Sequence, residues 1–228
     1  MTIHPPELLT HLAQHDTPTI CNALEILDPA RTAYGFTKRL LQCSHPDRSA
    51  RIGYARTAAI RTTPAHGETP AVLQARRLAY YDYINAGDSP KICVHQDLDG
   101  EAGIAACWGD VMANLHLGMG CVGVVTDGAF RDIPGMPAGI MMLARGEKPS
   151  HGELHTVTFG EPVQIDGMIV CDGDLVHMDR NGAVVVPHGL AARLPEAIGQ
   201  VVAKEAALIK AAQERPFNYA KVRGMMGG

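Results

Sequence analysis

The segment CVGVVTDGAFRD, residues 121–132, decides the fold class of this chain. Its first six residues are almost entirely apolar, which predicts a strand buried on both faces of a sheet. The helix predicted before it, residues 109–117, ends at Gly118 and Gly120, where glycine lets the backbone leave the helix. A helix, a buried strand and a polar turn containing Gly128 are typical of an α/β fold, which binds ligands at its strand ends.

The segments on either side continue this alternation. Proline near a helix start sets two further helix boundaries, with Thr17 and Thr69 as the expected caps, and Asn181-Gly182 predicts a β-hairpin. No linker or long repeat divides the chain, so we expect one domain over residues 1–228, although this length equals about one and a half average domains. The expected helices cover residues 5–15, 17–27, 70–86, 109–117 and 190–213, and the expected strands cover 56–61, 91–94, 121–126 and short runs between 163 and 186.

Composition limits the partners and the compartment. Hydrophobic residues make up 46% of the chain and charged residues 19%, as in ordinary globular proteins. The net charge of −4 and the lack of a basic block argue against a nucleic-acid partner. No apolar run approaches the roughly 18 residues of a membrane helix, so no membrane partner is expected. Six scattered cysteines and a polar N-terminal segment predict reduced thiols in a cytoplasmic protein.

Arg131 and Asp132 stand side by side just after the buried strand. The planar guanidinium of Arg131 suits a carboxylate or the paired oxygens of a keto acid. Asp132 offers the hard oxygen ligand that Mg²⁺ or Mn²⁺ prefers. An ordinary surface ion pair in a turn uses the same two residues and, on spacing alone, is the more common arrangement.

Gly109 and Asp110 stand at the start of the helix before that strand. In one interpretation Asp110 only caps the helix. In the other, the free N–H groups of Val111, Met112 and Ala113 bind an anion with the help of the helix dipole. Asp110 would then also hold a water ligand of a metal ion. Position alone favours the cap, and the two roles are compatible.

Glu205 interrupts the apolar side of the last predicted helix. It follows Val201 by four residues and precedes Leu208 by three, which places it near the middle of the apolar face. A glutamate is almost never fully buried without a partner. Glu205 therefore meets a cation, a metal ion or another subunit, or the helix is exposed there.

The histidines predict no zinc site. His151 and His155 flank Glu153, but the order and spacing differ from those of zinc proteases, and Gly152 indicates a loop. Three further histidines are expected to be ordinary surface or hairpin residues: His116, His177 and His188.

The stretch from Trp108 to Asp132, with weaker matches at 53–58, 173–176, 181–187 and Lys204-Glu205, resembles the RraA-like family. This family contains the class II 4-hydroxy-4-methyl-2-oxoglutarate/4-carboxy-4-hydroxy-2-oxoadipate aldolases and the regulator of ribonuclease E activity. The similarity runs from about residue 17 to 209, and residues 214–228 form a C-terminal tail. It implies a β/β/α swivelling-type fold with flanking N-terminal and C-terminal helices, assembled as a homotrimer or homohexamer.

The resemblance also implies a reaction and a site. Its aldolases release pyruvate from 4-hydroxy-2-oxo acids, decarboxylate oxaloacetate through the same pyruvate enolate, and use Mg²⁺ or Mn²⁺. The implied roles are metal binding by Asp132 and enolate stabilisation by Arg131. Beside Gly109, the amides of Val111 and Met112 would bind the substrate carboxylate. Asp110, with Glu205 from a neighbouring subunit, would orient the water that takes the 4-hydroxyl proton.

One spacing separates the two kinds of family member. Twenty residues lie between Asp110 and Arg131, as in the aldolase type. The regulator type has glycine at the first position and an acid three residues after the Arg-Asp pair, where this chain has Gly135. The resemblance therefore favours the metal-dependent lyase. The alternative is a non-catalytic partner protein that binds a ribonuclease.

Overall fold

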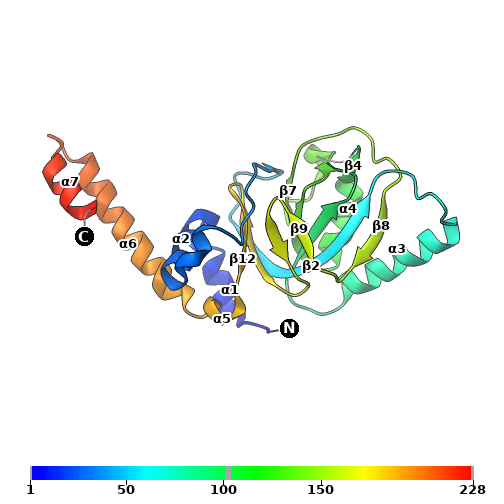
Figure 1. The fold of residues 1–228 in the computed structure, drawn as a ribbon, viewed down its shortest axis with the longest axis horizontal. Helices are drawn as coiled ribbons and strands as arrows, with labels where there is room; N and C mark the ends of the chain where they lie inside the picture. Colours follow the sequence, from blue (N-terminus) through cyan, green and yellow to red (C-terminus); the bar gives the residue numbers. More distant parts are fainter. Residues whose placement is uncertain (1, 101–103, 227–228) are drawn as a thin grey trace.

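The computed structural model describes residues 2–100 and 104–226, and within them an eight-stranded sheet forms the body of the molecule (Figure 1). Its spatial order is β1-β7-β5-β3-β2-β11-β12, and β8 pairs with β2. These strands are β1 Gln42–Cys43, β2 Arg51–Arg61, β3 Lys91–Asp97, β5 Cys121–Thr126, β7 Met141–Ala144, β8 His155–Phe159, β11 Leu175–Asp179 and β12 Gly182–Val186. Two small two-stranded sheets pair β4 Ala106–Trp108 with β6 Ala129–Phe130, and β9 Val163–Ile165 with β10 Met168–Val170.

Helices connect and flank these strands. They are α1 Pro6–Leu12, α2 Thr17–Leu27, α3 Pro70–Asn85, α4 Asp110–Gly118, α5 His188–Ala191, α6 Leu194–Gln213 and α7 Tyr219–Met226, with short 3₁₀ turns η1 Pro29–Thr32 and η2 Ile133–Gly135. The helix expected over 190–213 is therefore two helices, and the predicted tail contains α7. The α/β fold class is confirmed.

The centre of the sheet is parallel, as the buried central strand predicted. β2, β3, β5 and β7 run in the same direction, and parallel neighbours need long crossover connections, here through α3 and α4. Every residue of β5 except Val122 is buried. β2 and β3 are longer than expected, because β2 begins at Arg51 and β3 continues to Asp97.

Helix starts follow the expected chemistry with one shift. Thr69 caps α3 as predicted. At α2 the cap is Asp16, whose carboxylate accepts from the Thr19 N–H at 2.9 Å, and Thr17 is the first helical residue. Aspartate is among the strongest N-caps, so it takes this role one residue earlier than expected.

Three clusters of buried side chains hold the layers together. One lies between the sheet and helices α3 and α4, and a second lies on the opposite face under the β9–β10 hairpin. The third packs α1, α2 and α6 against the β2-β11-β12 end of the sheet. Figure 1 shows α6 and α7 extending away from the sheet on the side opposite α3.

Two expectations from composition concern membranes and disulfides. In residues 2–100 and 104–226, none of the helices combines the length and apolar character that a bilayer crossing requires. All six cysteines are free thiols. Cys93 and Cys121 come closest, with their sulfur atoms 3.5 Å apart on neighbouring strands.

Candidate active site

Two short strands bring the start of α4 next to the segment that follows β6. β4 and β6 pair in parallel, and the Arg131 N–H donates to the Trp108 carbonyl oxygen at 2.8 Å. Each strand leads directly into one half of the predicted site, Gly109-Asp110 after β4 and Arg131-Asp132 after β6. Parallel pairing places both strand ends at one edge, so Asp110 and Arg131, with twenty residues between them in sequence, are brought to the same place.

The two halves of the site approach most closely at Gly109. A Cβ atom on Gly109 would lie 2.8 Å from Asp132 Oδ2 and 3.3 Å from Arg131 Nε. A Cβ atom on Gly135 would lie 3.3 Å from Asp110 Oδ2. Glycine is thus required at position 109 for close approach, and it leaves the Asp132 carboxylate uncovered toward the helix start.

Arg131 and Asp132 do form the local ion pair that the sequence allowed. Arg131 Nε lies 3.2 Å from Asp132 Oδ2, and the two side chains are 35% and 42% exposed. Such a pair contributes at most about 1 kcal/mol to stability. Asp132 also has a left-handed backbone, with φ of 60°. A non-glycine residue in this region costs on the order of 1 kcal/mol, and such residues cluster at functional sites.

The helix start differs in detail from the expected anion site. Gly109 is the N-cap residue and Asp110 the first helical residue. Asp110 Oδ1 accepts from the Val111 N–H at 2.7 Å, and the Ala113 N–H donates to the Gly109 carbonyl oxygen at 2.9 Å. Within the described part of the chain, the Met112 N–H has no such partner. Asp110 therefore satisfies the helix end itself, and Met112 keeps the amide that is free for a ligand.

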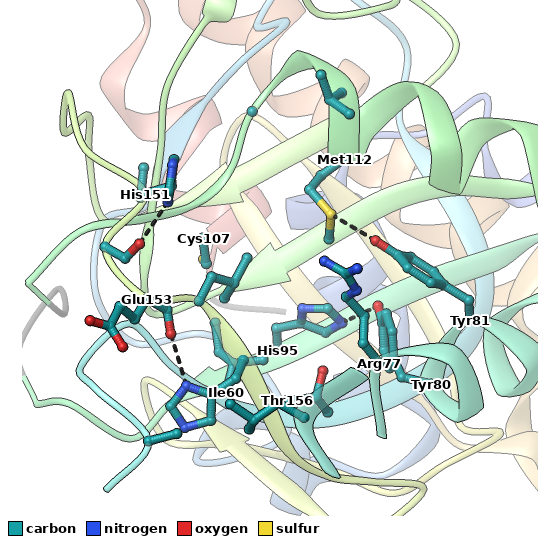
Figure 2. A pocket seen from close by; sticks show the side chains of 18 of the residues that line it. Ile60, Arg77, Tyr80, Tyr81, His95, Cys107, Met112, His151, Glu153 and Thr156 are labelled. Atoms are coloured by element: carbon teal, nitrogen blue, oxygen red, sulfur yellow. Dashed lines mark hydrogen bonds between the residues drawn. The ribbon is translucent and has the colours of Figure 1, made fainter. Parts of the chain in front are cut away.

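A cavity of about 550 Å³ opens beside these residues, between α3, the start of α4 and residues 151–156 (Figure 2). Five of the predicted site residues line it: Gly109, Asp110, Val111, Met112 and Arg131. Asp132 does not line the cavity itself. The structure thus brings six of the seven predicted site residues to one mouth.

A buried hydrogen-bond network behind the cavity was not expected. Tyr80 Oη lies 2.7 Å from His116 Nε2 and 2.9 Å from His95 Nε2, and His116 Nδ1 lies 2.7 Å from the Met112 carbonyl oxygen. The carbonyl only accepts, so His116 Nδ1 carries the proton and its Nε2 accepts from Tyr80. The Tyr80 oxygen then accepts from His95 Nε2, which leaves His95 Nδ1 without a proton.

Burial keeps both imidazoles of this network neutral. It lowers the pKa of His95 to about 3, with a smaller contribution from His116, and the pKa of His116 to about 4. The expectation that His116 is a surface residue is wrong, because it is fully buried. His177 lies in the β11–β12 hairpin, one of the two expected places, but its side chain is fully buried as well. In sequence they looked exposed because their partners, Tyr80 and Thr17, lie 36 and 160 residues away.

Glu205 lies apart from the other predicted site residues. It is exposed on α6, on the far side of the sheet from α4 (Figure 1), and accepts a hydrogen bond from Asn22 Nδ2 at 3.0 Å. A shallow hollow between α2 and α6 surrounds it. The sequence left four alternatives for Glu205: contact with a cation, a metal ion or another subunit, or exposure of the helix at that point. Within a single chain, the structure shows the last of these, an exposed position on α6.

The loop of His151, Glu153 and His155 lines the cavity opposite α4 but gathers no metal ligands. His151 Nδ1 and His155 Nδ1 contact backbone carbonyl oxygens nearby, at 2.6 and 2.8 Å. Across the described ranges, no three His, Cys, Asp or Glu side chains are arranged to hold a metal ion.

Comparison with known proteins identifies relatives of this architecture. A solved structure described as an uncharacterized protein from Pseudomonas syringae pv. tomato str. DC3000 has a TM-score of 0.70 and 24% identity, over 92% of this chain and 90% of that chain. Streptomyces coelicolor RraAS2, described as an unusual member of the RNase ES inhibitor RraA protein family, gives 0.69 and 23%, over 94% and 100%.

A third structure is described as one of novel cellulases from microbes associated with the gut ecosystem. It has a TM-score of 0.72 but 16% identity, over 91% of this chain and 89% of that chain. At such identities the likeness shows the shared fold alone. No curated protein matches this sequence.

The family profile extends beyond the central stretch that carried the resemblance. The profile of the RraA-like family, described as Aldolase/RraA, matches residues 17–185, which is most of the chain. It includes both halves of the candidate site and ends before α6, which carries Glu205. This protein belongs to the RraA-like family.

Proposed function

We propose that this protein is a divalent-metal-dependent lyase that releases pyruvate from 4-hydroxy-2-oxo acids of the 4-hydroxy-4-methyl-2-oxoglutarate type and decarboxylates oxaloacetate. The RraA-like family holds both aldolases and ribonuclease inhibitors, so family alone does not decide between them. The observation that carries the proposal is the approach of Gly109-Asp110 to Arg131-Asp132 at the mouth of a cavity. A binding surface for another protein needs no such cavity, whereas a small-molecule enzyme does.

The donors at this mouth fit Mg²⁺ or Mn²⁺. Asp132 supplies an exposed carboxylate that Gly109 leaves uncovered, and Asp110 supplies a second carboxylate near Gly135. Mg²⁺ commonly takes one or two protein carboxylates and fills its remaining positions with water and substrate oxygens. Asp132 would hold the ion, and its carboxylate oxygens are the ligands that a hard cation prefers.

The chain's own groups then have separate roles. A bound divalent ion would supply Lewis acidity at the keto oxygen and lower the pKa of water. The Arg131 guanidinium would bind the 2-oxo acid end and stabilise negative charge that develops there. The Met112 N–H would hold the substrate carboxylate, joined by Val111 once Asp110 releases it. Asp110 would orient the water that accepts the 4-hydroxyl proton.

Glu205 enters this proposal only through a second copy of the chain. Within one chain it lines the hollow between α2 and α6 and not the cavity that Arg131 lines. Ile26 and Val202, about half exposed there, favour contact with another subunit. We therefore propose a homotrimer or homohexamer in which Glu205 completes a neighbour's site. Mixing inactive Asp132→Ala and Glu205→Ala chains would restore part of the activity, and no recovery would remove Glu205 from the site.

The direct test is pyruvate release from oxaloacetate with Mg²⁺ or Mn²⁺, coupled to lactate dehydrogenase. The lyase produces pyruvate above the metal-only rate, and Arg131→Ala and Asp132→Ala abolish this excess without changing the oligomer. A panel of 4-hydroxy-2-oxo acids then identifies the aldol substrate. Pure, folded protein that never exceeds the metal-only rate would refute the lyase and leave the ribonuclease-binding role.

A further inference from the structure

The cavity has a second wall that the proposed chemistry does not use. One face of α3 forms this wall, with side chains at helical spacing that all line the cavity: Leu73, Gln74, Arg77, Tyr80 and Tyr81. A volume of about 550 Å³ lies in the range of cavities that enclose ligands much larger than a three-carbon acid. The α3 wall therefore faces space that pyruvate alone would leave empty.

Arg77 is the cation of this wall. Its guanidinium donates a hydrogen bond from Nη2 to Gln74 Oε1 at 3.3 Å, and within the described residues no carboxylate lies at ion-pair distance from it. Its neighbour Arg76 differs, because it pairs with Glu68 at 2.5 Å and donates to the Thr156 carbonyl oxygen at 3.2 Å. Arg76 therefore holds α3 against β8, while the Arg77 guanidinium is free to bind a carboxylate.

The surroundings of Arg77 suit an apolar chain that ends in an anion. Figure 2 shows the Arg77 side chain extending from α3 toward Met112, beside Tyr81. The Tyr81 hydroxyl lies 3.3 Å from Met112 Sδ, which is only a weak acceptor. Ile60 and Leu154 add apolar surface to the lining. Methylene groups would pack against this surface while a terminal carboxylate reaches the guanidinium.

We propose that the α3 wall is the subsite for the part of the substrate beyond C4. Arg77 selects, among 4-hydroxy-2-oxo acids, those whose distal carboxylate is separated from C4 by methylene groups, and so favours a longer substrate than 4-hydroxy-4-methyl-2-oxoglutarate, whose distal carboxylate is bonded to C4 itself. This inference rests on the proposed function, because it assigns Arg131 and Arg77 to opposite ends of one substrate. On cleavage the C3–C4 bond breaks, the 4-hydroxyl proton leaves, and the electron pair stays with the pyruvate half, which gains a proton at C3. The other half leaves as a carbonyl product held by Arg77, an aldehyde where C4 carries a hydrogen and a ketone where it carries a methyl group.

The reverse addition tests this selection with two matched aldehydes. Pyruvate loses a methyl proton and bonds to the aldehyde carbon, whose oxygen gains that proton, so no other reactant is needed. Succinic semialdehyde and butanal have the same length, and only the first carries a carboxylate. Wild-type kcat/KM favours succinic semialdehyde by at least about tenfold, the value of one charged hydrogen-bonding contact. Arg77→Met, which keeps the apolar stem, reduces this ratio to about one, and Arg77→Lys retains part of it.

A control variant and a binding measurement separate this inference from the proposed function. Lys210→Met removes an exposed cation on α6, away from the cavity, and leaves the ratio unchanged. Calorimetry with glutarate and pentanoate needs no turnover, and Arg77→Met weakens glutarate binding about tenfold without changing pentanoate binding. If oxaloacetate is not decarboxylated but this Arg77 effect is found, the lyase fails and the subsite stands. Equal glutarate binding by wild type and Arg77→Met, or no aldehyde preference in an active decarboxylase, overturns the subsite.

Discussion

The substitution Tyr80→Phe tests the buried network behind the cavity. It removes one hydroxyl group and keeps the ring that packs in the cluster between the sheet and α3. That hydroxyl makes two contacts with buried imidazoles, at 2.9 Å to His95 and 2.7 Å to His116. Without it, the His95 Nε2 proton and the His116 Nε2 lone pair both lose their only partner among the described residues.

The expected cost follows from these two contacts. A buried polar group left without a partner costs about 1–3 kcal/mol, so two such groups cost about 2–6 kcal/mol. This is a large part of a typical unfolding free energy of about 5–15 kcal/mol. Urea unfolding at pH 7.5 and fixed protein concentration measures the difference through the midpoint and the m-value. Tyr219→Phe is the matched control, because Tyr219 is 65% exposed and its variant should unfold as wild type does.

Two results would refute the reasoning about this network. A free energy of unfolding within about 0.5 kcal/mol of wild type, at an unchanged m-value, means that water or a rearranged side chain satisfies both imidazoles. Nitrogen-15 NMR supplies the second check. In wild type it should find neutral His116 protonated at Nδ1 and neutral His95 protonated at Nε2, and the opposite tautomers contradict the assigned hydrogen-bond directions.

Acid should destabilise the fold, since burial lowers the pKa of three imidazoles to between about 3 and 4: His95, His116 and His177. Their stabilising contribution is complete above the unfolded pKa of about 6.5 and is lost as the pH falls from there toward these values. Burial also raises the pKa of Asp127 to about 6, which stabilises the fold as the pH falls, but this involves one proton against three for the imidazoles. The urea midpoint should therefore fall between pH 7 and pH 4, and a constant midpoint contradicts this. Separately, Gly109→Ala should displace the Asp132 carboxylate, because the new Cβ would lie 2.8 Å from its Oδ2. Calorimetry should then show weaker Mn²⁺ binding at an unchanged melting temperature, and wild-type affinity would remove Asp132 from the metal site.

Local chemistry allowed the central elements to be predicted from the sequence. The apolar run 121–126 forms β5 where expected, and the hairpin expected at Asn181-Gly182 joins β11 and β12, with Arg180 and Asn181 in its turn and Gly182 first in β12. These features depend on neighbours within a few residues, so composition and turn chemistry suffice. The cap of α2 was placed one residue late because Asp16 and Thr17 are both good caps, and the choice depends on contacts with distant residues such as Asp179.

The buried face of α4 could not be predicted from the residues of α4 alone. Apolar spacing places Met112, Leu115 and Met119 on one face of α4, and Met112 and Met119 do pack against the core. Leu115, however, is 48% exposed, while Ala113 and His116 are fully buried. A histidine can lie on the buried face only because the Tyr80 hydroxyl arrives from α3 to satisfy its ring. Nothing within α4 signals that partner, so periodicity alone does not predict that His116 is buried.

The two walls of the cavity are built by different means, and this explains why the sequence pointed to one of them. The mouth depends on backbone geometry, namely the parallel pairing of β4 with β6, the glycine at 109 and the left-handed conformation of residue 132. Few residue types are compatible with this geometry, so it leaves a recognisable sequence motif. The opposite wall depends on side chains from one face of α3, where many residue types fold equally well and the helix pattern looks ordinary. A substitution such as Arg77→Met can therefore change which substrate fits without disturbing the geometry of Arg131 and Asp132. If the proposed lyase and its α3 subsite hold, the reacting end of the substrate is positioned by the fold, while the end that determines specificity is bound by a helix face whose residues can change independently.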